Sequence, residues 1–201
     1  TEAGRTAAID LLLATAALVR WGNRRVVDVF VETVEETYRR DRGDTGREMT
    51  RAIVLVLGEA FLMRDLPYAA AVALSIDHRR RVRRRLGVRT GRGDAFDIAY
   101  IVRADLHAFA RRIRMQLPAR EWLLRVVVGV GRAMPVSIRG RTIDRQRLAC
   151  VQGGVARAIS ESGDPVRYRA WCTAFRRLQA SVEDGTFHSL TLSEVEEALS
   201  T

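Results

Sequence analysis

Lysine is absent from this chain of 201 residues, and asparagine occurs only once, at Asn23. All 34 residues of the lysine and arginine class are therefore arginines, and they face only 24 carboxylates, which gives a net charge of +10. A guanidinium group keeps its proton in proteins and binds phosphate or carboxylate through two parallel bonds. The codon usage of a GC-rich genome explains both gaps, and the alternative is selection against lysine-directed tagging such as ubiquitin conjugation.

Long apolar runs and cysteines are scarce as well. The longest apolar run, Val126 to Val130, is far shorter than the roughly 18 residues that a membrane-spanning helix needs, so we expect no transmembrane segment. Cys150 and Cys172 are the only cysteines, and their place on apolar helix faces predicts core residues instead of a disulfide.

The motifs of common catalytic and metal sites are also missing. His78, His107 and His188 lie far apart and neither cysteine has a partner at zinc spacing, so we expect no metal and no cofactor. No serine occupies a Gly-x-Ser-x-Gly elbow. Asp97 and Asp105 could form a catalytic acid pair, but they lie two turns apart on the predicted helix. A non-enzymatic protein is the prediction, with a helical enzyme as a weak alternative.

Composition and length favour one folded domain over residues 1–201. Hydrophobic residues make up 47% of the chain and charged residues 29%, as in ordinary globular proteins. A strongly basic chain favours nucleic acid, an acidic membrane surface or an acidic protein as its partner. We expect an intracellular location, in a bacterial cytoplasm or in a host cell if the protein is viral. Thr1 predicts a processed or excised piece.

Apolar spacings of three and four residues predict helices throughout, and we therefore expect an all-α domain of eight or nine helices. The helices from Ala52 to Met63 and from Trp122 to Ala133 are apolar on nearly all sides, which predicts a buried pair at the centre. The other expected helices span about 5–21, 24–40, 67–86, 94–117, 142–162 and 165–185, with a short last one after Thr191 and Ser193. Thr45 followed by Glu48 predicts a capping box, and Gly129 and Gly131 predict a close approach of two helices.

Six of the seven residues from Arg79 to Arg85 are arginines. Crowding this much positive charge onto two helical turns stores repulsion that an anion would relieve. The interpretation is a surface that binds phosphates, and neutralising about six of them predicts a roughly 10³-fold loss of affinity between 50 and 200 mM salt. The predicted nucleic-acid-binding residues comprise this run and the loop after it: Arg79, Arg80, Arg81, Arg83, Arg84, Arg85, Arg89 and Arg92.

Two further basic clusters support the same interpretation, at Arg111, Arg112 and Arg114 and at Arg139, Arg141, Arg145 and Arg147. Aromatic residues do not interleave with any of the three clusters, so we expect phosphate contacts with little base reading. The competing explanation is a solvated helix end paired with acidic residues elsewhere, such as Glu32, Glu35 and Glu36.

The alternative function is a helical protein-protein interaction module that binds an acidic protein or an amphipathic helix. Gly93, Asp94, Phe96, Ile98 and Tyr100 resemble the later half of a BH3 segment in Bcl-2-type apoptosis regulators. That resemblance implies an all-α fold with a groove that binds a helix. The sequence departs from the family pattern at Arg89, where a leucine is expected, and it has no Asn-Trp-Gly-Arg segment.

Overall fold

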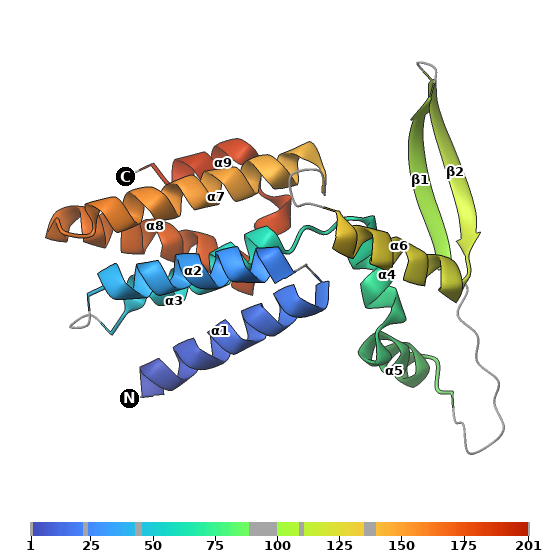
Figure 1. The fold of residues 1–201 in the computed structure, drawn as a ribbon, viewed down its shortest axis with the longest axis horizontal. Coiled ribbons are helices and arrows are strands. Elements are labelled where there is room, and N and C mark those ends of the chain that lie inside the picture. The colour runs from blue at the N-terminus through green and yellow to red at the C-terminus, as the bar shows by residue number, and fades with distance from the viewer. Residues whose placement is uncertain are drawn as a thin grey trace. The chain divides into compact units, whose positions relative to one another are not determined.

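The computed structural model describes residues 2–21, 24–42, 46–88, 100–108, 111–134 and 140–200 (Figure 1). The chain divides into two compact units: unit 1 comprises Thr1–Asp65 and Met134–Thr201, and unit 2 comprises Leu66–Ala133. The expectation of a single domain over residues 1–201 stays a prediction. Within the described ranges, no helix is both long and apolar enough to cross a membrane.

Unit 1 is entirely helical in its described residues, as predicted. Its elements are α1 (Glu2–Trp21), α2 (Arg24–Arg40), α3 (Glu48–Phe61), α7 (Thr142–Glu161), α8 (Pro165–Glu183), a 3-10 turn at Phe187–Ser189 and α9 (Leu192–Ala198). Unit 2 contains α4 (Leu66–Leu74), α5 (Ile76–Arg85), β1 (Tyr100–Ala108), β2 (Arg111–Ala119) and α6 (Glu121–Ala133). The fold is therefore mainly α-helical, with one hairpin as the exception.

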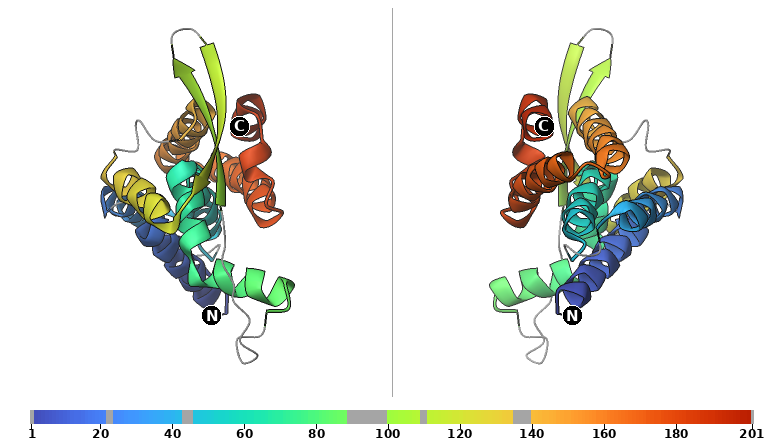
Figure 2. Two further views of the ribbon diagram at one scale, coloured as in Figure 1. Left: turned by 90° about the vertical axis from the view of Figure 1, so that its right-hand side faces the viewer. Right: turned by 90° about the vertical axis from the view of Figure 1, so that its left-hand side faces the viewer.

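Helix α3 is the centre of unit 1, which confirms the prediction for its apolar sequence. It packs against α1, α2, α7 and α8, and most of its residues are buried (Figures 1 and 2). Gly58 lets α1 approach closely, because a Cβ at this position would lie 3.1 Å from the Cβ of Ala14. Phe61 meets the ring of Phe30 edge-on, with 6.4 Å between the centroids. Burial of this kind supplies most of the free energy of folding.

The buried carboxylate of Asp41 joins the end of α2, the start of α3 and α8. It is only 5% exposed, and it accepts hydrogen bonds from the Thr50 backbone N–H at 2.8 Å, the Thr50 hydroxyl at 2.6 Å and the Tyr168 hydroxyl at 2.6 Å. An anion at the first turn of a helix satisfies free N–H groups there. The predicted capping box was wrong in its position, because α3 begins at Glu48 with Arg47 as its N-cap residue; Thr45 itself lies outside the described residues.

Replacing Tyr168 by Phe removes one donor from this buried carboxylate and leaves the rest of the ring in place. Because hydrogen bonds to charged groups contribute about 1.5–3 kcal/mol, we expect the free energy of unfolding to fall by about that amount. Urea unfolding followed by circular dichroism measures the change. Tyr38→Phe is the matched control, since Tyr38 is 52% exposed, and we expect it to stay within about 0.5 kcal/mol of wild type. Equal stability of both variants would contradict the role of Asp41.

Two ionic clusters fix the C-terminal part of unit 1. His188 Nε2 lies 2.7 Å from Glu59 Oε1, and Arg64 donates to the same oxygen at 3.0 Å. Arg147 is 3% exposed and donates to Asp144 and to the carbonyl oxygens of His188 and Leu190. Burial alone would raise the pKa of Glu59, but His188 and Arg64 hold this pKa below its ordinary value of 4.5.

A carboxylate with a lowered pKa in the folded state adds stability above its unfolded pKa, and this stability is lost as the pH falls through the folded pKa. We therefore expect the free energy of unfolding to decrease on acidification below about pH 4.5, where unfolded Glu59 takes up a proton. In the Glu59→Gln variant the neutral-pH stability is lower and the decrease with acid is smaller. Urea titrations across this pH range measure both effects, and parallel pH profiles for the two proteins would contradict the assignment.

Unit 2 has a small helical core in which α6 packs against α4. Ala70 and Leu124 are buried there, and Gly131 touches Pro67 so closely that a Cβ on the glycine would lie 2.2 Å from the proline Cβ. The predicted close approach is thus confirmed at Gly131, whereas a Cβ added at Gly129 would meet no atom of another element within 4 Å. The prediction that α6 is buried on all sides was wrong, since its outer face is exposed at three apolar positions: Trp122 (62%), Val126 (52%) and Val130 (54%).

The second correction concerns the helix predicted over 94–117. Strands β1 and β2 form an antiparallel hairpin instead, with Val102 paired with Leu117 and Leu106 paired with Ile113 (Figure 2). Apolar residues alternate with polar ones along both strands, which is the period of a strand with one apolar face. Tyr100, the last residue of the BH3-like segment, begins β1, whereas Gly93 to Ile98 lie outside the described residues.

Candidate polyanion-binding helix

Helix α5 carries the arginine run, and it is separate from α4. The sequence predicted one helix from Pro67 to Leu86, but the chain breaks at Ser75, which has an extended backbone (φ −68°, ψ 142°). The Ser75 hydroxyl oxygen accepts a hydrogen bond from the His78 backbone N–H at 3.1 Å, so Ser75 is the N-cap of α5. Asp77 places a negative charge in the first turn, where the helix dipole favours it.

The other end of α5 is closed by Gly87. This glycine has a positive φ of 67°, and its N–H donates to Arg84 O at 3.2 Å while the Val88 N–H donates to Arg83 O at 3.1 Å. This pair of bonds is a Schellman-type C-cap, which glycine favours because it has no Cβ. Arg83, Arg84 and Arg85 lie in the last turn, where the helix dipole favours positive charge.

Repulsion between the arginines opposes these caps. Five arginine pairs on α5 are spaced three or four residues apart, and such like-charge pairs each destabilise a helix by about 0.2–0.5 kcal/mol. Together they cost roughly 1–2.5 kcal/mol, which is similar to what two good caps contribute. The two caps therefore roughly offset the repulsion between the arginines. An anion bound along the helix would neutralise part of the arginine charge and reduce this repulsion.

The six arginines do not share one environment. Arg79 is half-buried, with its side chain 39% exposed, and its Nη2 lies 2.5 Å from Glu121 Oε2 on α6. Glu121 also accepts from Arg125 at 2.5 Å. The hydrogen bonds from Arg79 and Arg125 lower the pKa of Glu121, so this carboxylate stays ionised at neutral pH and ties α5 to α6. Arg83 is exposed and makes a further contact of its own.

The remaining four arginines form what we call the free arginine face: Arg80, Arg81, Arg84 and Arg85. All four are exposed, and none of them has an ion pair or hydrogen bond to another described side chain. At 100° per residue they cover an arc of about 140° on one side of α5 and about 7.5 Å of its length. Asp77 is the only carboxylate on α5.

The other predicted basic residues divide into three groups. Arg89, Arg92 and Arg139 lie outside the described residues, and Arg111, Arg112 and Arg114 lie on β2. Arg141, Arg145 and Arg147 contact their own unit: Arg141 binds Asp144, Arg145 donates to Gly140 O, and Arg147 is buried. Burial excludes Arg147 from a phosphate-binding surface, whereas the contribution of Arg141, whose side chain is 69% exposed, stays a prediction. Glu35 and Glu36, proposed as internal partners of the run, bind Arg39 and Arg40 of their own helix.

Two features of the site were missed at the level of sequence. Ser75 with Asp77 two residues later is a recognisable helix start, but it lies inside a continuous apolar pattern that predicted one long helix. Glu121 is 42 residues from Arg79 in the chain, so no local pattern could link them. No group of three or more histidine, cysteine or acidic side chains in the described part of the chain is arranged to hold a metal ion.

Comparison with known proteins adds no family to this description. No protein-family model matches the chain, and no curated protein or solved structure shows significant similarity to it.

The Ser75 cap offers a direct test of how α5 is stabilised. Ser75→Ala removes the acceptor for the His78 N–H, and loss of an N-cap costs about 1 kcal/mol. We expect amide hydrogen exchange in α5 to accelerate by roughly fivefold, because RT ln 5 is close to 1 kcal/mol. Ser75→Asp keeps a side-chain acceptor and is the matched control, with near wild-type exchange. Unchanged exchange in Ser75→Ala would show that the cap does not support α5.

Proposed function

We propose that this protein binds the phosphate backbone of nucleic acid through α5, without enzymatic activity. The observation that carries the proposal is the free arginine face, because four exposed guanidinium groups on one side of a capped helix have no partner among the described residues. Arginine is the side chain best suited to phosphate, since its fork donates two bonds to two oxygens. The net charge of +10 attracts a polyanion at long range.

The contacts expected from such a face position the nucleic acid but do not read its sequence. No aromatic residue lies between the arginines of α5, so stacking on bases, the usual mark of single-strand recognition, has no platform there. Phosphate contacts alone carry no base information. We therefore expect similar affinity for unrelated sequences, and the affinity depends strongly on salt.

The test compares two variants that each lose four positive charges. The site variant replaces Arg80, Arg81, Arg84 and Arg85 by Gln. The matched control replaces four other arginines by Gln: Arg39, Arg40, Arg167 and Arg169. These are exposed arginines of unit 1 with hydrogen bonds inside their own unit. The same net charge in both variants separates a local site from a general effect of basicity.

Wild type is expected to lose roughly 10²-fold in affinity for a random DNA duplex between 50 and 200 mM salt, as four phosphate contacts require. In the site variant the slope of log K against log salt becomes shallower by about 3 to 4, whereas the control keeps most of the wild-type slope. Fluorescence anisotropy at several ionic strengths measures both slopes. Wild-type affinity and slope in the site variant would rule out the proposal.

A protein-protein interaction module is the second candidate function, and the exposed apolar residues of α6 favour it. Trp122, Val126 and Val130 recur every four residues and form one apolar stripe on the helix. A partner held there would bind with little dependence on salt, would tolerate the four Arg→Gln changes on α5, and would be lost with Trp122→Ser. If a salt-dependent DNA complex still forms in the Trp122→Ser variant, the apolar stripe of α6 is not the binding site for DNA.

A further inference from the structure

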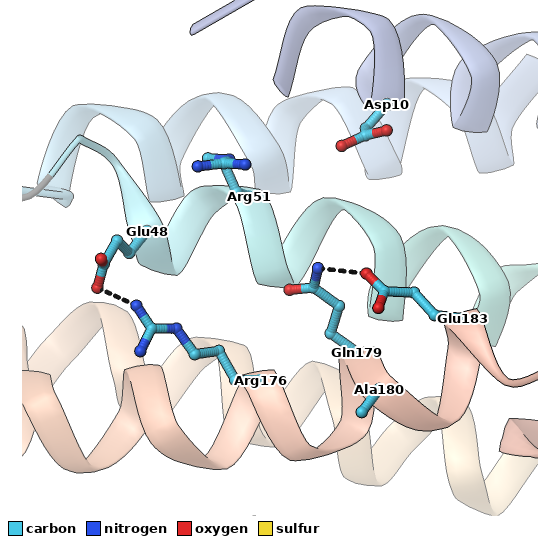
Figure 3. Close-up of a pocket in the computed structure, with 7 residues that line it drawn as sticks. All are labelled: Asp10, Glu48, Arg51, Arg176, Gln179, Ala180 and Glu183. Atoms are coloured by element: carbon cyan, nitrogen blue, oxygen red, sulfur yellow. Dashed lines mark hydrogen bonds and ion pairs between the residues drawn. The ribbon is translucent and has the colours of Figure 1, made fainter. Parts of the chain in front are cut away.

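A small polar cavity opens between α1, α3 and α8 of unit 1 (Figure 3). Its volume is about 270 Å³, close to the lower limit of cavities that hold small organic ligands. Five of its lining side chains are charged and a sixth is an amide: Asp10 from α1, Glu48 and Arg51 from α3, and Arg176, Gln179 and Glu183 from α8. A cavity lined this way does not suit an apolar helix, but it suits a small charged molecule.

Two pairs of these side chains already satisfy one another. Arg176 Nη2 lies 2.5 Å from Glu48 Oε2, and the Gln179 amide donates to Glu183 Oε1 at 2.7 Å (Figure 3). The first pair is a neutral ion pair. The second leaves the negative charge of Glu183 in place, because an amide donor does not neutralise a carboxylate.

Two other side chains in the cavity have no partner. The Arg51 Nε–H is fully buried and donates to no acceptor, and the Asp10 carboxylate has no ion pair or hydrogen bond within the described ranges. Arg51 lines the cavity, and no hydrogen bond or ion pair joins its guanidinium group to another described residue, so this side chain can bind an anionic group of a ligand.

We propose that this cavity binds a free basic amino acid, with the ligand carboxylate on Arg51 and its two cationic groups on Asp10 and Glu183. Once the Glu48–Arg176 pair is set aside, the cavity holds two negative charges and one positive charge. The complementary ligand carries one carboxylate and two cationic groups, which describes arginine or lysine at neutral pH. The site lies in unit 1 and uses none of the residues of the free arginine face, so it stands or falls separately from nucleic-acid binding.

The experiment is calorimetric titration of the full chain with three compounds that differ by one group. L-arginine carries both recognition groups, agmatine is the same molecule without the carboxylate, and the desamino acid of arginine lacks the α-ammonium group. We expect saturable binding of L-arginine in the millimolar range or below, and at least about tenfold weaker binding of each analogue, because each loses a charge-assisted contact.

Two single variants assign the contacts. Arg51→Gln removes the partner of the ligand carboxylate, and Asp10→Asn removes one of the two acidic partners of the ligand cations. We expect each variant to weaken L-arginine binding roughly tenfold or more. Arg167→Gln changes an exposed arginine of α8 outside the cavity and should leave binding unchanged. Circular dichroism checks that each variant is folded, and Asp10→Asn, at a partly exposed position of α1, remains informative if Arg51→Gln is not folded.

Three results would overturn the proposal. Absence of saturable L-arginine binding would mean that the cavity holds only water. Agmatine binding as tightly as L-arginine would mean that no carboxylate is recognised. Unchanged L-arginine affinity in both Arg51→Gln and Asp10→Asn would place the binding elsewhere on the protein.

Discussion

Every guanidinium group of this chain must find an acceptor or stay in water, because its charge cannot be removed. With 34 arginines and 24 carboxylates, one-to-one pairing leaves at least ten arginines without a partner. The structure places the two kinds differently. Arg147 is buried and bonded to a carboxylate and two carbonyl oxygens, whereas Arg39 and Arg40 pair with acids one turn away in their own helix. On α5, four arginines that have no partner among the described residues lie on one face and give that surface a positive charge.

The two proposed sites use the same side chain in opposite surroundings. On α5 the guanidinium groups are exposed and numerous, so their effect is additive and reaches through solvent until salt screens it. In unit 1, Arg51 lines a cavity together with three acidic side chains and one other arginine, and its Nε is buried. A buried charge interacts more strongly at short range and discriminates between ligands by geometry. The first arrangement suits a long polymer, and the second suits a molecule with few atoms.

The sequence correctly predicted helices whose apolar residues follow one regular spacing. Helix α2 was predicted with its observed limits, α3 was expected to be central, and α8 begins at Pro165 as predicted. The hairpin was missed because a spacing of four, as between Val102 and Leu106, fits both a helix and an alternating strand. Ala104 and Met115, apolar residues at the positions between, carry the strand signal. Three features could not be predicted because they join residues that are distant in the chain: the Arg79–Glu121 contact, the Asp41 network and the cavity. A single sequence contains no local pattern that links such residues.

The exposed indole of Trp122 is a fluorescence probe for anion binding at α5. Its neighbour Glu121 holds Arg79, so an anion that competes for that guanidinium alters the charge next to the indole. Trp122 is 62% exposed while Trp171 is 1% exposed, and a water-soluble quencher therefore reaches the first ring and hardly the second. Of these two indoles, Trp122 thus reports from unit 2 and the shielded Trp171 reports from the packed interior of unit 1. The third tryptophan, Trp21, lies at the end of α1.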